Sequence, residues 1–417
     1  MRRTLLPFLL LVLAYCTAGV ANACTAFKIT REGRTIVGNN EDAWSINAQV
    51  RFEQGHDGGY GVVYFGHFNG HPLRSMVDQL GMNEAGLVLD GLSIQPKSAP
   101  AIAGKKQVPF DELMPMVLRS CADVHQAAAI LRTTDNSWLT QSMLFLTDRN
   151  GEYLIVEADT LIFGNADTYA VGNWRMSSCT DPDAIPIPRL QAGRALLTDG
   201  TTTSIAQGTA VLERMKACRT KLGEGTLFSV LFDTQLLQAH LYFYHDFSEV
   251  ITFNLKDELA KGDRTVAMAP LFGARPEYDA LVGYITPFHV RWLFWALVAW
   301  LGLAVLVGVV CAVLFLVRAV RCMLRKPAGR LMPIVLLGLT CLVMVLITGS
   351  LLMKEGVYYF GLGDVEPFVA WSPLVLIALL ALLAWSWRHG PRWSMVGGAL
   401  LLLPYVFLLG YWGMLIP

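Results

Sequence analysis

The sequence predicts an α+β domain in residues 24–287, followed by a membrane domain in residues 288–417. Three observations lead to this prediction. Strand-length runs and segments of helical spacing alternate as far as Pro287, charged residues are spread over the same part of the chain, and four long uncharged runs follow Arg291. A chain of 417 residues has room for two domains of about 100 to 200 residues each.

Composition excludes two broad classes of protein. Hydrophobic residues make up 54% of the chain and charged residues 16%, which is too apolar for a disordered chain. Lys plus Arg and Asp plus Glu both number 33, so the formal net charge is zero. A nucleic-acid-binding protein normally shows a basic excess. No nucleic-acid partner is therefore expected, and the apolar excess points to lipid.

Short β-type runs and helical segments alternate in the N-terminal domain. Residues 27–29 and 35–38 flank Glu32-Gly33, which predicts a β-hairpin. Further runs of strand length lie at residues 62–65, 143–146, 153–156 and 241–244. Helical spacing marks residues 111–119, 124–132 and 190–197. A two-sheet core with outer helices fits this order of elements.

Four uncharged apolar runs predict four transmembrane helices. They lie at about residues 292–317, 331–353, 367–387 and 393–417. Roughly 20 apolar residues span a hydrocarbon core of about 30 Å, and each run reaches that length. A buried core helix can imitate one such run, but hardly four in succession.

The charges between these runs predict their orientation. The loops after the first and third runs carry no acidic residue, and their arginines and lysine are Arg318, Arg321, Arg325, Lys326, Arg330, Arg388 and Arg392. Lys and Arg concentrate on the cytoplasmic side of a membrane. The sequence therefore predicts a multi-pass membrane protein whose α+β domain and C-terminus lie on the periplasmic or extracytoplasmic side.

Residues 1–23 have the features of a signal peptide. Arg2 and Arg3 form a basic start, an apolar stretch follows, and Ala21-Asn22-Ala23 supplies a small-x-small cleavage pattern. Cleavage after Ala23 would make Cys24 the first residue of the mature protein. An uncleaved anchor and a lipoprotein cysteine are the alternative interpretations.

A cysteine at a mature N-terminus carries its own base. The α-amino group has a pKa of about 7.7 to 8.0 and the thiol one of about 8.5, so much of the amine is neutral near neutral pH. The neutral amine lies a few bonds from the sulfur and can take the thiol proton directly or through a water. Inside an intact chain the same nitrogen is a non-basic amide. Removal of the leader would therefore activate Cys24.

Motifs along residues 24–270 resemble those of one group of enzymes. They include CTAF at 24–27, GNNED at 38–42, GMNEAGL at 81–87, TDRNG at 147–151 and YAVGN at 169–173. In their order and spacing they resemble the choloylglycine hydrolase, penicillin V acylase and acid ceramidase group of linear amide C–N hydrolases. These enzymes are N-terminal-nucleophile hydrolases. The resemblance implies a four-layer αββα sandwich and cleavage of a linear amide through a cysteine thioester.

The resemblance also implies roles for three residues. Cys24 would be the nucleophile with its own amine as base, and Asp42 would hold that amine or the substrate in place. Asn173 would donate its side-chain amide to the oxyanion. A turn residue at Asp42 and a loop-capping amide at Asn173 are the alternative roles.

Two positions depart from the pattern of the group. Asn39 stands where choloylglycine hydrolases carry an arginine, and an amide cannot supply the guanidinium charge that would recognise bile-salt-like acids. Ser93 stands where they carry a second asparagine near the oxyanion, so that donor would be weakened to a hydroxyl. A late arginine of the group has no secure match, and Arg189 and Arg194 are the candidates. Bile-salt hydrolysis is therefore disfavoured, while amide hydrolysis remains.

Asn39, Asn40, Asn83 and Ser93 are weaker candidates for substrate or oxyanion contacts. Asn40 would fix a turn beside Asp42, and Asn83 would hold the turn of its own motif. The histidines of this domain give no Cys–His pattern and are interpreted as surface or core residues; they are His56, His67, His71, His240 and His245. No CxxC or HExxH spacing appears, so neither a metal nor a cofactor is expected.

The leading hypothesis is an exported, membrane-anchored amidase with a small acylated amide as substrate and the lipid bilayer as its other partner. The alternatives are an acyltransferase that uses the same acyl-enzyme, and a catalytically silent domain that senses acyl ligands. Uncharged spans argue against ion or proton transport. The acyl group, the oligomeric state and a disulfide between Cys179 and Cys218 remain open.

Overall fold

The computed structural model describes most of the chain from Cys24 onward. The described residues are 24–43, 45–68, 76–217, 225–324, 332–353, 357–360, 372–373, 375, 377 and 393–415. They form two compact units, and the boundary between these units along the chain lies between Tyr284 and Ile285. The predicted signal peptide at 1–23, most of the predicted span at 367–387, and Cys218 lie outside the described residues.

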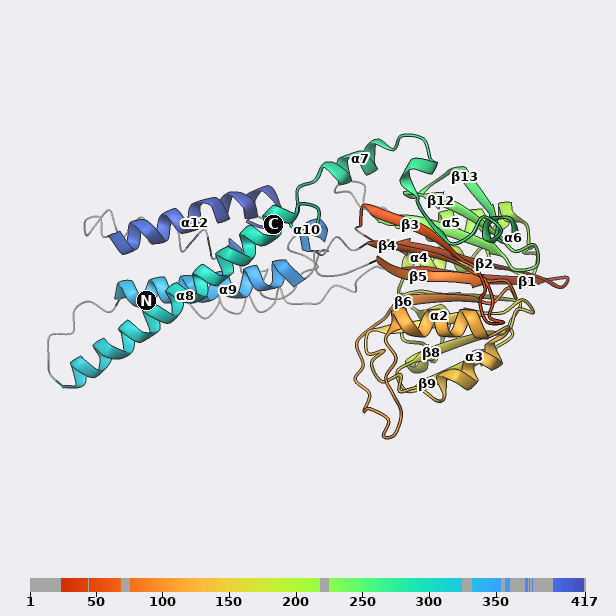
Figure 1. Ribbon diagram of the computed structural model, residues 1–417, viewed down its shortest axis with the longest axis horizontal. Coiled ribbons are helices and arrows are strands. Elements are labelled where there is room, and N and C mark those ends of the chain that lie inside the picture. The colour runs from red at the N-terminus through yellow and green to blue at the C-terminus, as the bar shows by residue number, and fades with distance from the viewer. Residues whose placement is uncertain are drawn as a thin grey trace. The chain divides into compact units, whose positions relative to one another are not determined.

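A β-hairpin opens the first unit, as the sequence predicts. Strands β1 (Thr25–Arg31) and β2 (Arg34–Asp42) pair antiparallel, and Glu32 and Gly33 turn the chain with φ angles of 51° and 72°. The hairpin lies within a six-stranded antiparallel sheet of order β10-β1-β2-β11-β12-β13. Figure 1 labels β1, β2, β12 and β13 of this sheet. The other strands are β10 (Thr168–Val171), β11 (Thr226–Asp233), β12 (Gln238–Phe243) and β13 (Asp246–Asn254).

A second antiparallel sheet has eight strands in the order β14-β3-β4-β5-β6-β7-β8-β9. Its strands are β3 (Asn47–Glu53), β4 (Val62–Phe68), β5 (Met76–Asn83), β6 (Val88–Ser93), β7 (Ser142–Thr147), β8 (Tyr153–Glu157), β9 (Thr160–Gly164) and β14 (Arg264–Ala267). The runs predicted at 62–65, 143–146 and 153–156 therefore lie in β4, β7 and β8.

Strand β7 shows how this second sheet divides its two faces. Successive side chains of a strand point to opposite faces. Met143 and Phe145 belong to a core that includes β1 and β2, whereas Leu144 and Leu146 pack with helices α2 (Phe110–Ser120) and α3 (Val124–Leu131). One face of the eight-stranded sheet thus meets the other sheet, and α2 and α3 cover its outer face.

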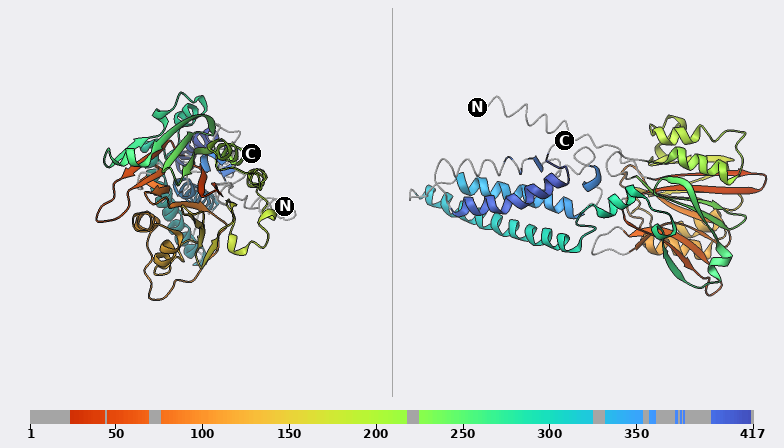
Figure 2. Two further views of the ribbon diagram at one scale, coloured as in Figure 1. Left: turned by 90° about the vertical axis from the view of Figure 1, so that its right-hand side faces the viewer. Right: turned by 90° about the horizontal axis from the view of Figure 1, so that it is seen from above.

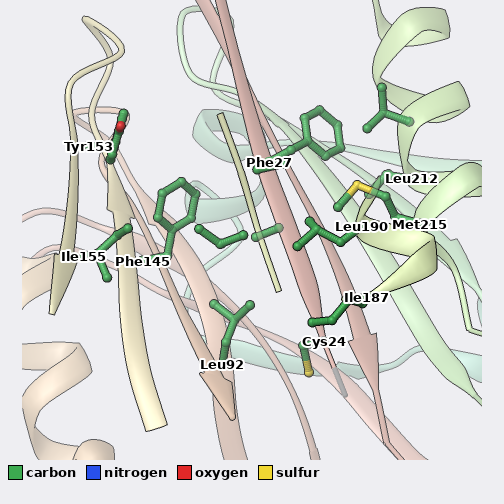
Figure 3. Packing of buried hydrophobic residues seen from close by; sticks show 14 of the residues in the cluster. Cys24, Phe27, Leu92, Phe145, Tyr153, Ile155, Ile187, Leu190, Leu212 and Met215 are labelled. Carbon is green, nitrogen blue, oxygen red and sulfur yellow. The ribbon is translucent and has the colours of Figure 1, made fainter. Parts of the chain in front are cut away.

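Helices α4 (Pro188–Arg194) and α5 (Ile205–Met215) cover the outer face of the six-stranded sheet. Gly208 allows α5 to approach closely, because a Cβ at this position would lie 2.7 Å from Leu231 and 3.1 Å from Ile36. Figure 3 shows Leu212 and Met215 on one side of β1, with Phe145 of the second sheet on the other. The order of layers is helix, sheet, sheet and helix, as predicted.

Some boundaries differ from the prediction. The helix expected at 190–197 begins at Pro188, whose fixed φ suits a first helical position, and it ends at Arg194. The run expected at 241–244 lies largely in β12, which ends at Phe243. After β13 the chain forms helix α6 (Leu255–Leu259), because the Asn254 side chain accepts hydrogen bonds from two backbone amides and caps a helix there. The first unit also contains α7 (Pro276–Gly283) and three short 3₁₀ turns at Met176–Ser178, Pro182–Ala184 and Ala269–Leu271.

The second unit is helical in the described residues. Its helices are α8 (Arg291–Met323), α9 (Met332–Met353), α10 (Val357–Phe360) and α12 (Trp393–Tyr411) (Figure 2). Helices α8 and α9 pack against each other at Gly308 and Gly338, where an added Cβ would be in ordinary van der Waals contact with Cys341 (3.5 Å) and Cys311 (3.4 Å).

Of the helices that the structure describes, α8 is long and apolar enough to cross a membrane. Shorter apolar helices lie at Leu337–Met353 and Leu402–Tyr411. The runs predicted at 292–317, 331–353 and 393–417 are therefore largely helical, while a transmembrane region of four helices stays a prediction.

Candidate active site

Cys24 comes directly before the first residue of β1. The neighbouring strands β2 and β10 bring further candidate residues beside it. Ala26 pairs with Asn39 in β2 and with Val171 in β10. Since both neighbours run antiparallel to β1, Glu41 and Asn173 follow two residues later, toward Cys24. The cysteine is 5% exposed and belongs to the core between the layers. Figure 3 shows it at the margin of that core, close to Ile187.

The sulfur of Cys24 contacts a buried carboxylate. Its thiol donates to Oε2 of Glu41 at 3.1 Å, and Glu41 itself is 3% exposed. The other oxygen, Oε1, lies 3.4 Å from Nε2 of His67 on β4. Cys24, Glu41 and His67 therefore form a continuous line from one sheet to the other.

This environment opposes ionisation of the thiol. Burial raises the pKa of Cys24 well above its usual value, and the carboxylates of Glu41 and Asp42 raise it further, against a backbone hydrogen bond from Asp42 that lowers it. A thiolate is the reactive form of cysteine. In the chain as it stands, Cys24 is therefore a protonated, weakly reactive thiol.

Asp42 lies at the end of β2 on the face opposite to Glu41. Its carboxylate is paired with the guanidinium of Arg189 on α4, and Oδ1 accepts a hydrogen bond of 2.7 Å from Thr226 Oγ1 on β11. Burial raises the pKa of Asp42, whereas Arg189 and Thr226 lower it. Burial has the larger effect, so the pKa of Asp42 lies above its usual value, and the cation of Arg189 partly offsets the cost of burying the ionised carboxylate.

Arg189 joins Asp42 to Asn173. A second nitrogen of the same guanidinium, Nη2, lies 3.4 Å from Oδ1 of Asn173. Nδ2 of Asn173 donates to the backbone carbonyl of Ser93 at 2.7 Å. Two of the predicted catalytic residues are therefore connected through one arginine, which was one of the two candidates for the unmatched arginine.

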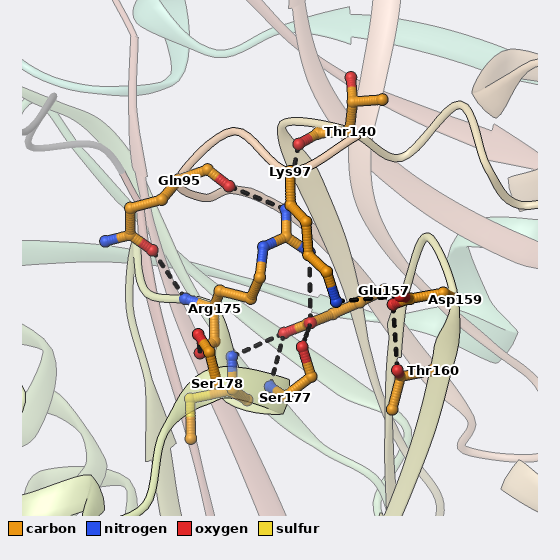
Figure 4. Close-up of polar contacts among 10 residues, drawn as sticks. Gln95, Lys97, Thr140, Glu157, Asp159, Thr160, Arg175, Ser177 and Ser178 are labelled. Carbon is orange, nitrogen blue, oxygen red and sulfur yellow. Dashed lines mark hydrogen bonds and ion pairs between the residues drawn. The ribbon is translucent and has the colours of Figure 1, made fainter. Parts of the chain in front are cut away.

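The loop that carries Asn173 is held by a buried ion pair. Glu157 pairs with Arg175 at 3.2 Å and accepts a hydrogen bond of 2.6 Å from the amide of Met176 (Figure 4). Gln95 donates to the carbonyl of Asn173 at 2.8 Å and accepts from the amide of Arg175 at 2.8 Å. These contacts fix the backbone on both sides of residue 174.

Asn39, which the sequence made a candidate for a substrate contact, faces the second sheet. Its Nδ2 donates to Oδ2 of Asp90 on β6 at 2.7 Å. Asp90 is 1% exposed, and burial together with the charge of Glu41 raises its pKa well above the usual value. Asn39 therefore binds a buried carboxyl group of the protein.

The hydrogen bonds of Asn40 and Asn83 connect elements of the fold. Asn40 donates to the carbonyl of Leu212 on α5 at 3.0 Å and accepts from Ser229 on β11 at 2.6 Å. Asn83 donates to two carbonyls at the end of α2 and accepts from two amides of its own turn. Their contacts support structural roles for both.

Ser93 reaches the site through its backbone. Its side chain is exposed, and its carbonyl accepts the hydrogen bond from Asn173. The group of Ser93 that contacts Asn173 is therefore its backbone carbonyl, and not the side-chain hydroxyl that was expected to donate.

Sequence reasoning missed Glu41, His67 and Asp90 as members of this site. Glu41 could have been found, because on a strand it shares a face with Asn39 and lies opposite Cys24. His67 and Asp90 gave no signal, because they reach Glu41 and Asn39 across the gap between the sheets. In the part of the chain that the structure describes, no group of three or more His, Cys, Asp or Glu side chains could hold a metal ion.

Solved structures similar to this chain include two hydrolases. A variant of conjugated bile acid hydrolase from Clostridium perfringens is 14% identical, with 61% of this chain and 99% of that chain covered and a TM-score of 0.46. Penicillin V acylase from Agrobacterium tumefaciens is 14% identical, with 56% and 86% covered and a TM-score of 0.41. No protein-family model and no curated protein sequence matches the chain.

Proposed function

We propose that the chain is the precursor of an exported, membrane-anchored amide hydrolase whose nucleophile is Cys24. One observation carries the proposal. The residue that follows the predicted cleavage pattern lies in the interior at the meeting point of β1, β2 and β10, beside the connected side chains of Asp42, Arg189 and Asn173. A cysteine that only fills a hydrophobic core would not require charged and amide side chains beside it.

Cleavage after Ala23 would supply the missing base. The freed α-amine takes the thiol proton, and the sulfur attacks the carbonyl carbon of a linear amide. The C–N bond then breaks, the nitrogen leaves with a proton, and the acyl group remains on the sulfur as a thioester. Water attacks the thioester, the carboxylic acid leaves, and the thiol is restored.

The neighbouring side chains divide the remaining work. Asp42, whose ionised form is stabilised by Arg189, holds the freed amine close to the sulfur. Asn173, oriented by Arg189 and Ser93, offers its amide nitrogen to the oxygen of the tetrahedral intermediate. Such preorganised donors act most strongly in a site from which water is excluded.

The acyl group is proposed to be uncharged near Asn39. A bile-salt-like acid would need a cation at that position, but Asn39 binds Asp90, and the carboxylates of Glu41 and Asp42 lie close to the sulfur. An anionic group placed there would be repelled. This favours a small acylated amide over a bile salt.

The membrane anchor is proposed to be the second unit. Helix α8 is long enough to cross a bilayer, and the arginines that follow it favour a cytoplasmic position for its C-terminal end. The α+β domain then lies outside the cytoplasm. With the other apolar runs as spans, the protein has four transmembrane helices.

Replacement of the nucleophile tests the proposal. Acetyl, octanoyl and palmitoyl amides of aminomethylcoumarin are offered to the full-length protein in detergent, together with Cys24→Ala and Cys24→Ser. We expect release of the fluorescent amine by the wild type and none by Cys24→Ala. Equal release by Cys24→Ala would contradict the proposal, and transfer of the acyl group to added hydroxylamine in preference to water would favour an acyltransferase.

A further inference from the structure

Glu41 has a buried carboxylate with a partner on each oxygen. Oε2 accepts the hydrogen bond from the Cys24 thiol at 3.1 Å, and Oε1 lies 3.4 Å from His67 Nε2. Neither contact is used by the reaction proposed above. Burial of a carboxylate is costly unless its oxygens are bound, so this arrangement calls for an explanation.

We infer that Glu41 is a positioning residue for Cys24: one oxygen orients the sulfur, and His67 holds the other so that the carboxylate cannot turn away. The inference rests on the proposed function. It adds a carboxylate–imidazole arm that approaches the sulfur from the second sheet, while Asp42 and Arg189 lie on the opposite face of β2.

Glu41 is not expected to be the base. An unperturbed glutamate carboxylate is a weaker base than an α-amine by about 3.5 pKa units, or about 3,000-fold, so the amine is the group that accepts the thiol proton. The carboxylate instead fixes the direction of the S–H bond and, through its charge, keeps the sulfur protonated until the amine is present.

The pH at which the Cys24 thiol ionises depends on the charged side chains around its sulfur. Glu41 and Asp42 come from β2, His67 from β4, Asp90 from β6 and Arg189 from α4. Of these side chains, Glu41 is the one that both contacts the sulfur and raises the pKa of the thiol through its charge and its hydrogen bond. Removal of its charge must therefore lower the pH at which Cys24 ionises.

Two variants separate the charge from the contact. Glu41→Gln removes the charge and keeps an oxygen that can accept from the thiol. Glu41→Leu removes both. Asp148→Asn is the matched control, since Asp148 is a buried carboxyl group in the β7–β8 turn that binds backbone amides there.

The readout is the rate at which iodoacetamide alkylates Cys24 in the full-length protein, followed against pH by mass spectrometry of the peptide that contains it. We expect the midpoint to fall by about one pH unit in both Glu41 variants and to stay unchanged in Asp148→Asn. Turnover of the coumarin amides should fall about 100-fold in Glu41→Leu and less in Glu41→Gln.

An unchanged midpoint in Glu41→Gln overturns the inference, even if Glu41→Leu fails to fold. Full turnover by a folded Glu41→Leu overturns it as well. If the wild type hydrolyses none of the amides although its N-terminus is processed, the proposed function fails, and the alkylation midpoints still decide whether Glu41 controls the sulfur.

Discussion

The Cys24 thiol lies among more acidic than basic side chains. Burial and the charges of Glu41 and Asp42 raise its pKa. In a chain that still has its leader, the nitrogen of Cys24 is a non-basic amide. Under the proposed function, cleavage places an ammonium group next to these carboxylates, and a nearby positive charge favours the thiolate.

Arg189 is expected to stabilise the fold mainly when Asp42 is ionised. Burial raises the pKa of Asp42 in the folded chain. The free energy of unfolding therefore falls as pH rises from the pKa of an unfolded aspartate through that of the folded chain. Arg189 reduces this loss because it stabilises the ionised carboxylate. Arg189→Met should therefore cost about 3 to 5 kcal/mol near neutral pH. Near pH 4, where an unfolded aspartate is about half protonated, the cost should be smaller.

Thermal unfolding of Arg189→Met and of Arg189→Lys at both pH values checks this prediction. Lysine keeps the charge but cannot bind Asp42 and Asn173 together through a planar fork, so it should restore stability better than turnover. A cost of Arg189→Met that does not depend on pH would contradict the pairing.

Asn173→Ala should lower turnover without loss of the fold around Cys24. An oxyanion donor typically contributes about 100- to 1,000-fold to the rate. Alkylation of Cys24 by iodoacetamide should keep its wild-type pH profile, because replacing the neutral amide of Asn173 by a methyl group changes no charge near the sulfur. If turnover and thermal stability fall together by a similar free energy, the amide caps the loop and has no catalytic role.

At the scale of elements, the loop after β10 is tied to β8. The Glu157–Arg175 pair is almost fully buried, with side-chain exposures of 0% and 5%. Glu157→Leu leaves Arg175 and the amide of Met176 without their partner, so it should cost about 3 to 5 kcal/mol. We also expect faster hydrogen exchange of residues 173–178 and lower turnover through displacement of Asn173.

Glu157→Gln is the matched control for this loop. It retains an oxygen for the Met176 amide and should lose less stability than Glu157→Leu. Wild-type hydrogen exchange of residues 173–178 in Glu157→Leu would show that the ion pair does not fix the loop.

Local pattern was sufficient to predict elements whose contacts are local in sequence. The hairpin at Glu32-Gly33 and helices α2 and α3 appear where turn residues and helical spacing placed them. The Glu41–His67 contact could not be predicted in the same way. It joins β2 of one sheet to β4 of the other, and the packing of two sheets is set by the whole sandwich.

On the scale of the whole molecule, the uncharged runs and the loop charges predicted a topology that α8 supports in part. Cys322 lies exposed near the C-terminal end of α8, in the segment expected to face the cytoplasm. A membrane-impermeant maleimide should label it in inside-out vesicles and not in right-side-out vesicles. Cys322→Ser provides the control, and labelling in right-side-out vesicles would reverse the proposed orientation.

The order of motifs predicted the αββα layers. No sequence pattern could show that the buried Cys24 lies near a carboxylate, Asp42, that is paired with Arg189. These contacts join residues far apart in the chain, such as Asp42, Arg189 and Thr226. Their geometry depends on α4 packing over the six-stranded sheet.

Activation of Cys24 by processing can be tested by the mass of the N-terminal peptide of the protein purified from its native membrane. We expect a peptide that begins at Cys24 with a free α-amine and that carries a thiol-reactive probe on its sulfur. A protein that still begins at Met1, or whose Cys24 nitrogen is acylated, would have no base for the proposed reaction and would rule out the proposed mechanism.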